Sequence, residues 1–126
     1  MATTLAAKPS AAEAAIVTKA LVRAAGNLKL ANTALGAIVG LSDATISRMK
    51  KGAYVLAPTD KAFELAVLFV RMYRSLTAIV GGDDQVARAW LDNENLALQA
   101  RPIQRIQSVS GLVDVINYLD ARRAVV

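Results

Sequence analysis

Side chains able to contact DNA gather at helical spacing between Ser42 and Lys51. The segment 33–52 predicts two short helices joined by a tight turn, because apolar residues recur at helical spacing on both sides of Gly40-Leu41-Ser42. Ser42 should cap the second helix, whose N-terminal and outward positions can reach base edges in a major groove. The candidate DNA contacts are Ser42, Asp43, Ala44, Thr45, Ser47, Arg48, Lys50 and Lys51. Arg48 is the best candidate for a bidentate contact to guanine, and the two lysines should meet phosphate.

The spacing around the turn is that of a helix-turn-helix. Gly36 lies where the two helix backbones must come closest, and Gly40 lies where the chain leaves the first helix with positive φ. The inward positions are Leu35, Val39, Leu41, Ile46 and Met49. A plain helical hairpin in a small bundle can also show apolar residues at such spacings. DNA binding is favoured because a small residue, a turn glycine, an apolar residue directly after it and a basic C-terminal end coincide.

Two neighbouring segments should hold these helices in place. The stretch Ser10 to Glu13 has the form of a capping box, and the Ala-rich helix that it starts should stop at Gly26. We assign residues 1–13 to a mobile tail and residues 14–80 to a helix-turn-helix DNA-binding domain. The second segment is a helix from about Asp60 to Val80, which Thr59 should cap.

That second helix contains the most apolar run of the chain, Leu65 to Val70. A transmembrane span needs roughly 20 apolar residues, whereas this run has six and is followed by Arg71 and Arg74. We therefore predict a central core helix and no membrane partner. Because so small a chain cannot surround this helix fully, its spare face should form a homodimer, as palindromic operators favour. The candidate dimer contacts are Phe63, Val67, Val70 and Tyr73.

Composition indicates an all-α fold and removes most catalytic chemistry. The 126 residues include no cysteine and no histidine, which excludes disulfides, thiolate nucleophiles, Cys/His zinc sites and His-based triads. An enzyme is therefore the least favoured class, no cofactor or metal is expected, and a cytoplasmic location fits. Asp83 and Asp84 follow a double glycine, where two acids usually serve as helix cap and dipole partners rather than as a cation site.

Charge is distributed unevenly along the chain. Residues 1–75 carry ten Lys and Arg against four acids, a net charge of +6. Residues 76–126 carry five Arg against six acids, a net charge of −1. The imbalance indicates that only the first half meets phosphate.

The second half resembles a known family. The order ARAWLDNENLALQARPIQRIQSVSGLVDVINYL, with Trp90-Leu91, Asn95, Ala97-Leu98, Pro102, Ile106, Gly111-Leu112, Val115 and Tyr118-Leu119, is similar to the C-terminal toxin-binding domain of Xre/MbcA/ParS antitoxins. That resemblance implies a type II toxin–antitoxin module. In it, an N-terminal helix-turn-helix represses the operon and residues 81–126 bind a RES-domain toxin that consumes NAD. The toxin contacts that we then expect are Trp90, Arg101, Ile106, Tyr118, Arg122, Arg123, Val125 and Val126.

Two hypotheses remain at this stage for an all-α chain with a helix-turn-helix domain and a small helical domain. The first is an antitoxin with a RES-domain toxin, operator DNA and a second copy as partners. The alternative is a stand-alone repressor whose C-terminal half only oligomerises. In the antitoxin, the last helix should start after a cap at Ser110 and end at Asp120. Residues 121–126 would then form a short basic tail that blocks the toxin.

Overall fold

Within residues 10–124, the part of the chain described by this computed structural model, the secondary structure is helical, apart from a single antiparallel bridge between Asn95 and Ala100. The all-α prediction is therefore confirmed. No helix among these residues is long and apolar enough to cross a membrane. The helices are α1 (Ala11–Asn27), α2 (Asn32–Val39), α3 (Asp43–Lys50), α4 (Lys61–Ile79), α5 (Asp84–Asp92), α6 (Pro102–Arg105) and α7 (Val109–Ala124).

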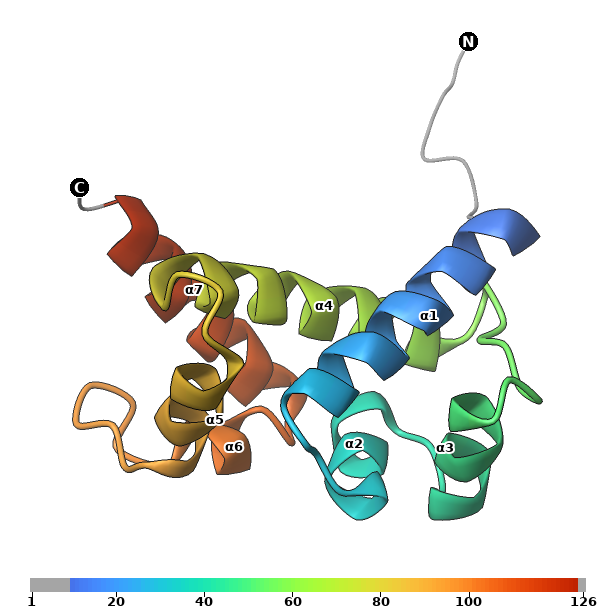
Figure 1. Cartoon of the computed structure of the whole chain (residues 1–126), viewed down its shortest axis with the longest axis horizontal. Coiled ribbons are helices and arrows are strands. Elements are labelled where there is room, and N and C mark those ends of the chain that lie inside the picture. Colours follow the sequence, from blue (N-terminus) through green and yellow to red (C-terminus); the bar gives the residue numbers. More distant parts are fainter. Residues whose placement is uncertain (1–9, 125–126) are drawn as a thin grey trace, which may run out of the picture.

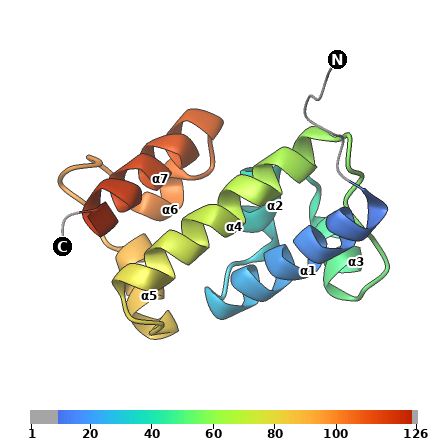
Figure 2. The ribbon, with the colours of Figure 1, turned by 90° about the horizontal axis from the view of Figure 1, so that it is seen from above.

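Helix α4 is the axis of the molecule. It lies between α1 on one side and α7 on the other (Figure 2), with α2 and α3 below one end and α5 and α6 below the other (Figure 1). Leu65, Phe69, Met72 and Leu76 are buried along it. One hydrophobic cluster includes buried residues of both halves, so α4 is the core helix that its composition predicts.

The start of α1 has the predicted capping box. The Ser10 hydroxyl accepts from the Glu13 amide at 3.1 Å, and the Glu13 carboxylate accepts from the Ser10 amide at 2.9 Å. Residues 11–13, expected in the mobile tail, are therefore the first turn of α1, because the capping box closes around the Glu13 amide. Residues 1–9 lie outside the described part of the chain.

Two glycines allow the close turn between α2 and α3. A Cβ on Gly36 would lie 2.4 Å from the Leu41 carbonyl oxygen, so only glycine fits there. Gly40 ends α2 with φ of +77°, the left-handed conformation. The Ser42 hydroxyl then caps α3 by accepting from the Thr45 amide at 3.2 Å. Leu35, Val39, Ile46 and Met49 are buried and Leu41 is half-buried, as the pattern predicts.

The irregular segment between α3 and α4 is attached to α1 by a buried threonine. The Thr18 hydroxyl donates to the Ala14 carbonyl at 2.7 Å and accepts from the Leu56 amide at 3.0 Å. The Leu56 side chain beside it is 1% exposed. The predicted cap at Thr59 is wrong, because Asp60 is the N-cap residue of α4 and its side chain makes no capping bond.

Both ends of α7 differ from the prediction. Its cap is Ser108, not Ser110, because the Ser108 hydroxyl accepts from the Gly111 amide at 3.1 Å. Gly111 packs so closely on α6 that a Cβ would lie 1.9 Å from the Arg105 carbonyl oxygen. The helix continues to Ala124, so residues 121–124 are helical and not a tail.

Candidate nucleic-acid and protein interfaces

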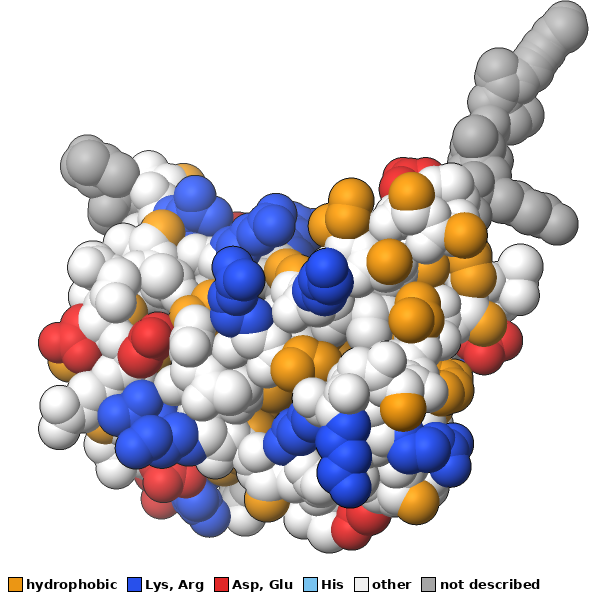
Figure 3. All heavy atoms as spheres, turned by 45° about the vertical axis from the view of Figure 1, so that its right-hand side comes forward, with side chains coloured by type: hydrophobic (Ala, Val, Ile, Leu, Met, Phe, Trp, Pro, Cys, Tyr) orange, Lys and Arg blue, Asp and Glu red, His pale blue; other side chains and the backbone are white. Residues whose placement is uncertain are grey.

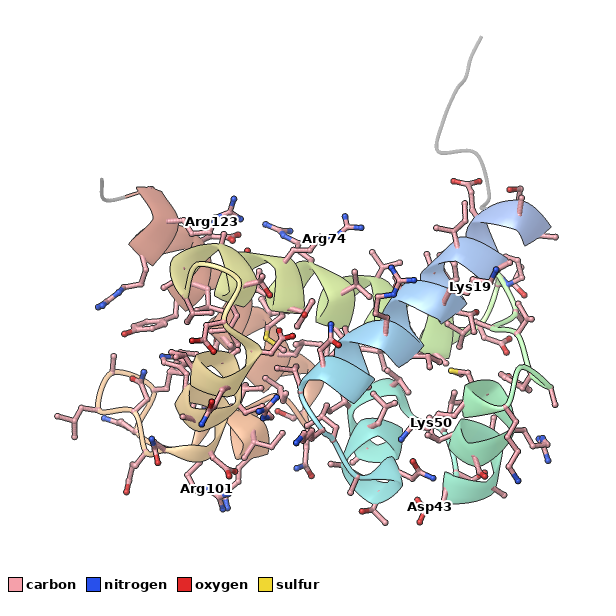
Figure 4. All side chains as sticks on the ribbon, in the orientation of Figure 1. Lys19, Asp43, Lys50, Arg74, Arg101 and Arg123 are labelled. Carbon is pink, nitrogen blue, oxygen red and sulfur yellow. The ribbon has the colours of Figure 1, made fainter. Side chains whose placement is uncertain are left out.

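The outward face of α3 carries most of the predicted DNA contacts. Ser42, Asp43, Ala44, Arg48 and Lys51 are exposed, while Thr45 and Ser47 are half-buried. Figure 4 shows Asp43 at the lower end of the molecule, away from α4. The Ser42 hydroxyl is already engaged as the cap and donates to the Thr45 hydroxyl at 3.0 Å, so it is less available to a base than its position indicated.

Arg48 is held over an aromatic ring. Its guanidinium carbon lies 6.0 Å from the centre of the Tyr54 ring, and its Nη2 donates to the Thr45 hydroxyl at 3.4 Å. Both contacts are weak and leave most of the guanidinium donors open. The side chain is therefore oriented in advance for a planar, bidentate acceptor.

Lys50 points sideways along the domain. Its ammonium donates to the Asn32 side-chain oxygen, and Figure 4 shows it directed from α3 toward α2. A phosphate contact from Lys50 would lie at the first turn of α2, and not on the outward face that Arg48 occupies. Lys51, just beyond α3, is exposed.

In the C-terminal half, aromatic side chains connect α5 with α7. The rings of Trp90 and Tyr118 stack with centres 6.2 Å apart, and the Arg122 guanidinium lies 5.6 Å from the centre of the Tyr118 ring. Val86, one helical turn before Trp90, is 48% exposed. We call Val86, Trp90, Tyr118 and Arg122 the aromatic strip. A half-exposed aromatic pair with an arginine is typical of protein interfaces.

Two predicted toxin contacts have structural roles instead. Ile106 is wrong as a direct contact, because its side chain is completely buried. Arg101 closes the loop between α5 and α6: its guanidinium bonds the Asp92 carboxylate and the Asp92 carbonyl, each at 2.8 Å. That loop presents Leu96, which is 92% exposed and which the sequence analysis did not select. The sequence signal was an apolar residue directly after the polar run Asn93 to Asn95.

The end of α7 is joined to α4 by a polar cluster. Asp120 accepts from Arg71 at 2.7 Å and from the Ser75 hydroxyl at 2.9 Å, and Arg123 donates to the same hydroxyl at 3.1 Å. The Ser75 hydrogen bond, followed by the two arginines and partly opposed by burial, holds the pKa of Asp120 below its ordinary value. Arg123 is thus a link between the halves, which the sequence could not show. Val125 and Val126 lie outside the described residues.

The predicted dimer contacts are only partly accessible. Phe63 is 8% exposed, and the Tyr73 hydroxyl is bonded to the Asn27 and Asp84 side chains at 2.9 Å and 3.0 Å. Phe63 and Tyr73 therefore stabilise the fold of the single chain. Val67, at 42% exposure, and the half-buried Val70 remain on the surface.

The two acids after the double glycine have capping and bridging roles. The Asp83 carboxylate caps α5 by accepting from the Gln85 and Val86 amides at 3.0 Å and 3.2 Å, and Asp84 accepts from Tyr73. Within residues 10–124, no group of three His, Cys, Asp or Glu is placed to hold a metal ion.

Comparison with known families divides the chain inside α4. Residues 9–71 match the antitoxin Xre-like helix-turn-helix domain, and residues 75–124 match the antitoxin Xre/MbcA/ParS C-terminal toxin-binding domain. The junction precedes the double glycine at which we expected the boundary, and it falls in the helix that both halves share. No curated protein matches the chain.

Proposed function

This chain belongs to the Xre-like antitoxin family, and we propose that it neutralises a RES-domain toxin that consumes NAD and represses its own operon. The observation that carries the proposal is the presence, in one chain, of an exposed basic helix α3 and of the aromatic strip at the other end of α4. The first surface suits DNA and the second suits a protein. The RES identity of the toxin comes from the resemblance described above.

Repression is supported by the orientation of α3. Its N-terminal and outward residues are exposed, and Arg48 presents open donors beside Tyr54. Arginine is the residue that most often reads guanine in a major groove. The exposed Lys51 supplies a phosphate contact just beyond the helix.

Neutralisation is supported by the aromatic strip. Tyr and Arg side chains contribute the largest binding energies in protein interfaces when they are desolvated. Arg122 lies over Tyr118 and precedes Val126 by four residues. We assign affinity to the strip and the block of the toxin's active site to residues 121–126, which include Val125 and Val126.

A homodimer is supported by the surface between α1, α4 and α7. A groove of about 610 Å³ lies there, and its lining includes Ile16, Val67 and Val70 together with Arg71, Arg74 and Arg123. Figure 4 shows Arg74 and Arg123 together on the upper side of the molecule. Ile16 and Val67 are 67% and 42% exposed, so an apolar surface is available to a second copy.

Charge along α4 makes this surface self-complementary. Glu64, Val67, Arg71 and Arg74 recur every three or four residues and are all exposed. If two copies of α4 cross antiparallel next to Val67, Arg71 of one copy, which pairs with Asp120 of its own chain, also faces Glu64 of the other, because each lies about 5 Å from the crossing point. The dimer would bring two α3 helices to the two halves of a palindromic operator.

One experiment separates the antitoxin from a stand-alone repressor. The chain is co-expressed with a neighbouring RES-type reading frame, and cell growth, NAD content and co-purification are measured. An antitoxin restores growth and NAD and co-purifies with the toxin. Growth arrest with no complex would contradict neutralisation and leave the repressor, in which the C-terminal half only oligomerises.

The dimer is tested with two matched valines. Val67→Asp should give a folded monomer in sedimentation, because a carboxylate in an apolar contact is costly to desolvate. Val113→Asp, on α7 with 38% exposure, should remain dimeric. A wild-type chain that is monomeric at micromolar concentration would overturn the dimer.

A further inference from the structure

A second groove lies beside α3, and its charge is entirely positive. Its volume is about 470 Å³, and it lies between α1 and the segment after α3. Lys19 and Arg23 from α1 and Lys50 from α3 line it, together with Val22 and Val55. Figure 4 shows Lys19 on α1, above the α3 end that carries Lys50. No acidic residue of the described chain lines this groove.

The groove continues the outward face of α3. Tyr54 lines it, and the same ring carries Arg48 at 6.0 Å. Four cations therefore line the groove or lie at Tyr54 on its edge: Lys19, Arg23, Arg48 and Lys50. Within residues 10–124, none of these four forms an ion pair. Figure 3 shows Lys and Arg side chains gathered beside hydrophobic ones on the lower right of the molecule.

We propose that Lys19 and Arg23 form a clamp for the sugar–phosphate backbone of the DNA duplex that α3 reads. The inference rests on the proposed DNA-binding function and adds α1 to its contact surface. The two residues are four positions apart on one helix face, a rise of about 6 Å. Since one strand carries a phosphate every 3.4 Å or so of duplex axis, the pair can reach two neighbouring phosphates. Such contacts fix the register of α3 in the major groove without reading sequence.

The clamp predicts a change in salt dependence rather than in base preference. Lys19→Gln/Arg23→Gln removes two phosphate contacts, so the slope of log K against log salt for a random duplex of about 30 base pairs should become less steep by about 2. Binding near physiological salt should weaken about tenfold or more. Both side chains are exposed on a helix, so the fold should persist, and circular dichroism checks it.

The control is Arg101→Gln/Arg105→Gln, which removes the same formal charge at the other end of the molecule from two arginines that pair with Asp92 and Asp114, and circular dichroism checks its fold as well. Figure 4 shows Arg101 far from Lys19. Its slope should equal that of the wild type. Equal slopes for wild type and the α1 variant would overturn the clamp, and so would an equal loss in the control, which would show a general charge effect.

Two further outcomes separate this inference from the functions on which it rests. If the wild type binds no duplex at all, DNA binding itself fails and the clamp fails with it. If the α1 variant keeps its DNA slope but no longer co-purifies with the toxin, the groove binds a protein, and the clamp is overturned while neutralisation stands.

Discussion

The two halves of the chain use their basic residues in opposite ways. In the N-terminal half, Lys19, Arg23 and Arg48 face solvent, and within the described residues none has a carboxylate partner. In the C-terminal half, Arg101 pairs with Asp92 and Arg105 pairs with Asp114. Two of the five C-terminal arginines are therefore neutralised by neighbouring carboxylates. The surface around α3 offers a cluster of unpaired cations to an outside anion.

Exposed large apolar residues lie in both halves, four within residues 10–80 and four within the shorter segment 81–124. Val86, Leu96, Val109 and Val113 of the C-terminal half are between 38% and 92% exposed. Val86 belongs to the aromatic strip. An apolar and aromatic surface suits a protein partner, whereas unpaired cations gathered along one groove suit nucleic acid. The comparison is tested by changing one half of the chain and measuring both DNA binding and toxin binding.

The largest effects should come from glycines that admit no side chain. Gly36→Ala would place a Cβ 2.4 Å from the Leu41 carbonyl, and Gly111→Ala would place one 1.9 Å from the Arg105 carbonyl. Each should cost about 3 kcal/mol or more in unfolding free energy, measured by urea denaturation. Gly36→Ala should abolish DNA binding first, and Gly111→Ala should abolish toxin binding first. If both functions are lost together in each variant, α4 couples the halves and the comparison fails.

A helical glycine without neighbours is the control for that prediction. A Cβ on Gly26 of α1 would meet nothing within 4 Å. Gly26→Ala should therefore stabilise the chain by about 0.5–1 kcal/mol, because alanine is favoured over glycine inside a helix. If Gly26→Ala lowers the free energy of unfolding, alanine is poorly tolerated for a reason other than a Cβ clash, and the losses at Gly36 and Gly111 cannot be assigned to their clashes.

The next largest effect should fall on the toxin complex. Tyr118→Ala removes the ring that stacks on Trp90 and supports Arg122, and it should cost about 2 kcal/mol or more in toxin affinity, measured by calorimetry. DNA affinity should not change. Tyr54→Ala is the matched variant, since it removes the ring under Arg48 in the other half and should affect DNA alone. Loss of DNA affinity in Tyr118→Ala would contradict the separation of functions.

Arg48→Ala should have a smaller effect that is confined to DNA. We expect a cost of about 1–3 kcal/mol and relaxed preference at one base pair, measured by gel-shift titration against a set of operator variants. Lys51→Ala should weaken all sequences alike and flatten the salt slope, because it contacts phosphate. Unchanged operator binding in Arg48→Ala would remove this residue from the reading face.

Local chemistry made much of the fold predictable. Four residues act through their neighbours in sequence, by capping a helix or turning the backbone. All four behave as the sequence indicates: Ser10, Gly36, Gly40 and Asp83. The cap of α7 was misplaced by two residues, because Ser108 and Ser110 both precede an apolar helix. Which serine accepts the bond depends on the close packing of Gly111 against α6.

The partner surfaces were harder to predict, because they depend on which side chains are consumed by contacts far away in the sequence. Ile106 and Phe63 have the types expected of contact residues, yet tertiary packing buries both. Arg123 and Asp120 look like the end of a charged tail but bond to Ser75, more than 40 positions earlier. The spacing of residues within one segment cannot predict a hydrogen bond between residues so far apart in the sequence.

The smallest effect concerns pH and belongs to the junction between the halves. The Ser75 hydroxyl lowers the pKa of Asp120, so between the lowered pKa and the ordinary value near 3.8 the unfolded chain binds more protons than the folded one. Stability from this contact is present above that value and is lost as pH falls through the lowered pKa. Ser75→Ala should therefore reduce stability by less than about 1 kcal/mol near neutral pH, since the pair is partly exposed. The deficit should shrink as pH falls toward 2 or so, as measured by thermal melting.

Ser110→Ala is the control for this pH dependence, because Ser110 is an exposed serine of the same helix α7 as Asp120. Any loss of stability in Ser110→Ala should not vary with pH, because within the described residues no carboxylate is bonded to the Ser110 hydroxyl. A deficit in Ser75→Ala that stays constant from neutral to acid pH would mean that the hydroxyl acts through packing or through Arg123 alone. The charge of Asp120 would then not help to join the DNA-binding half to the toxin-binding half.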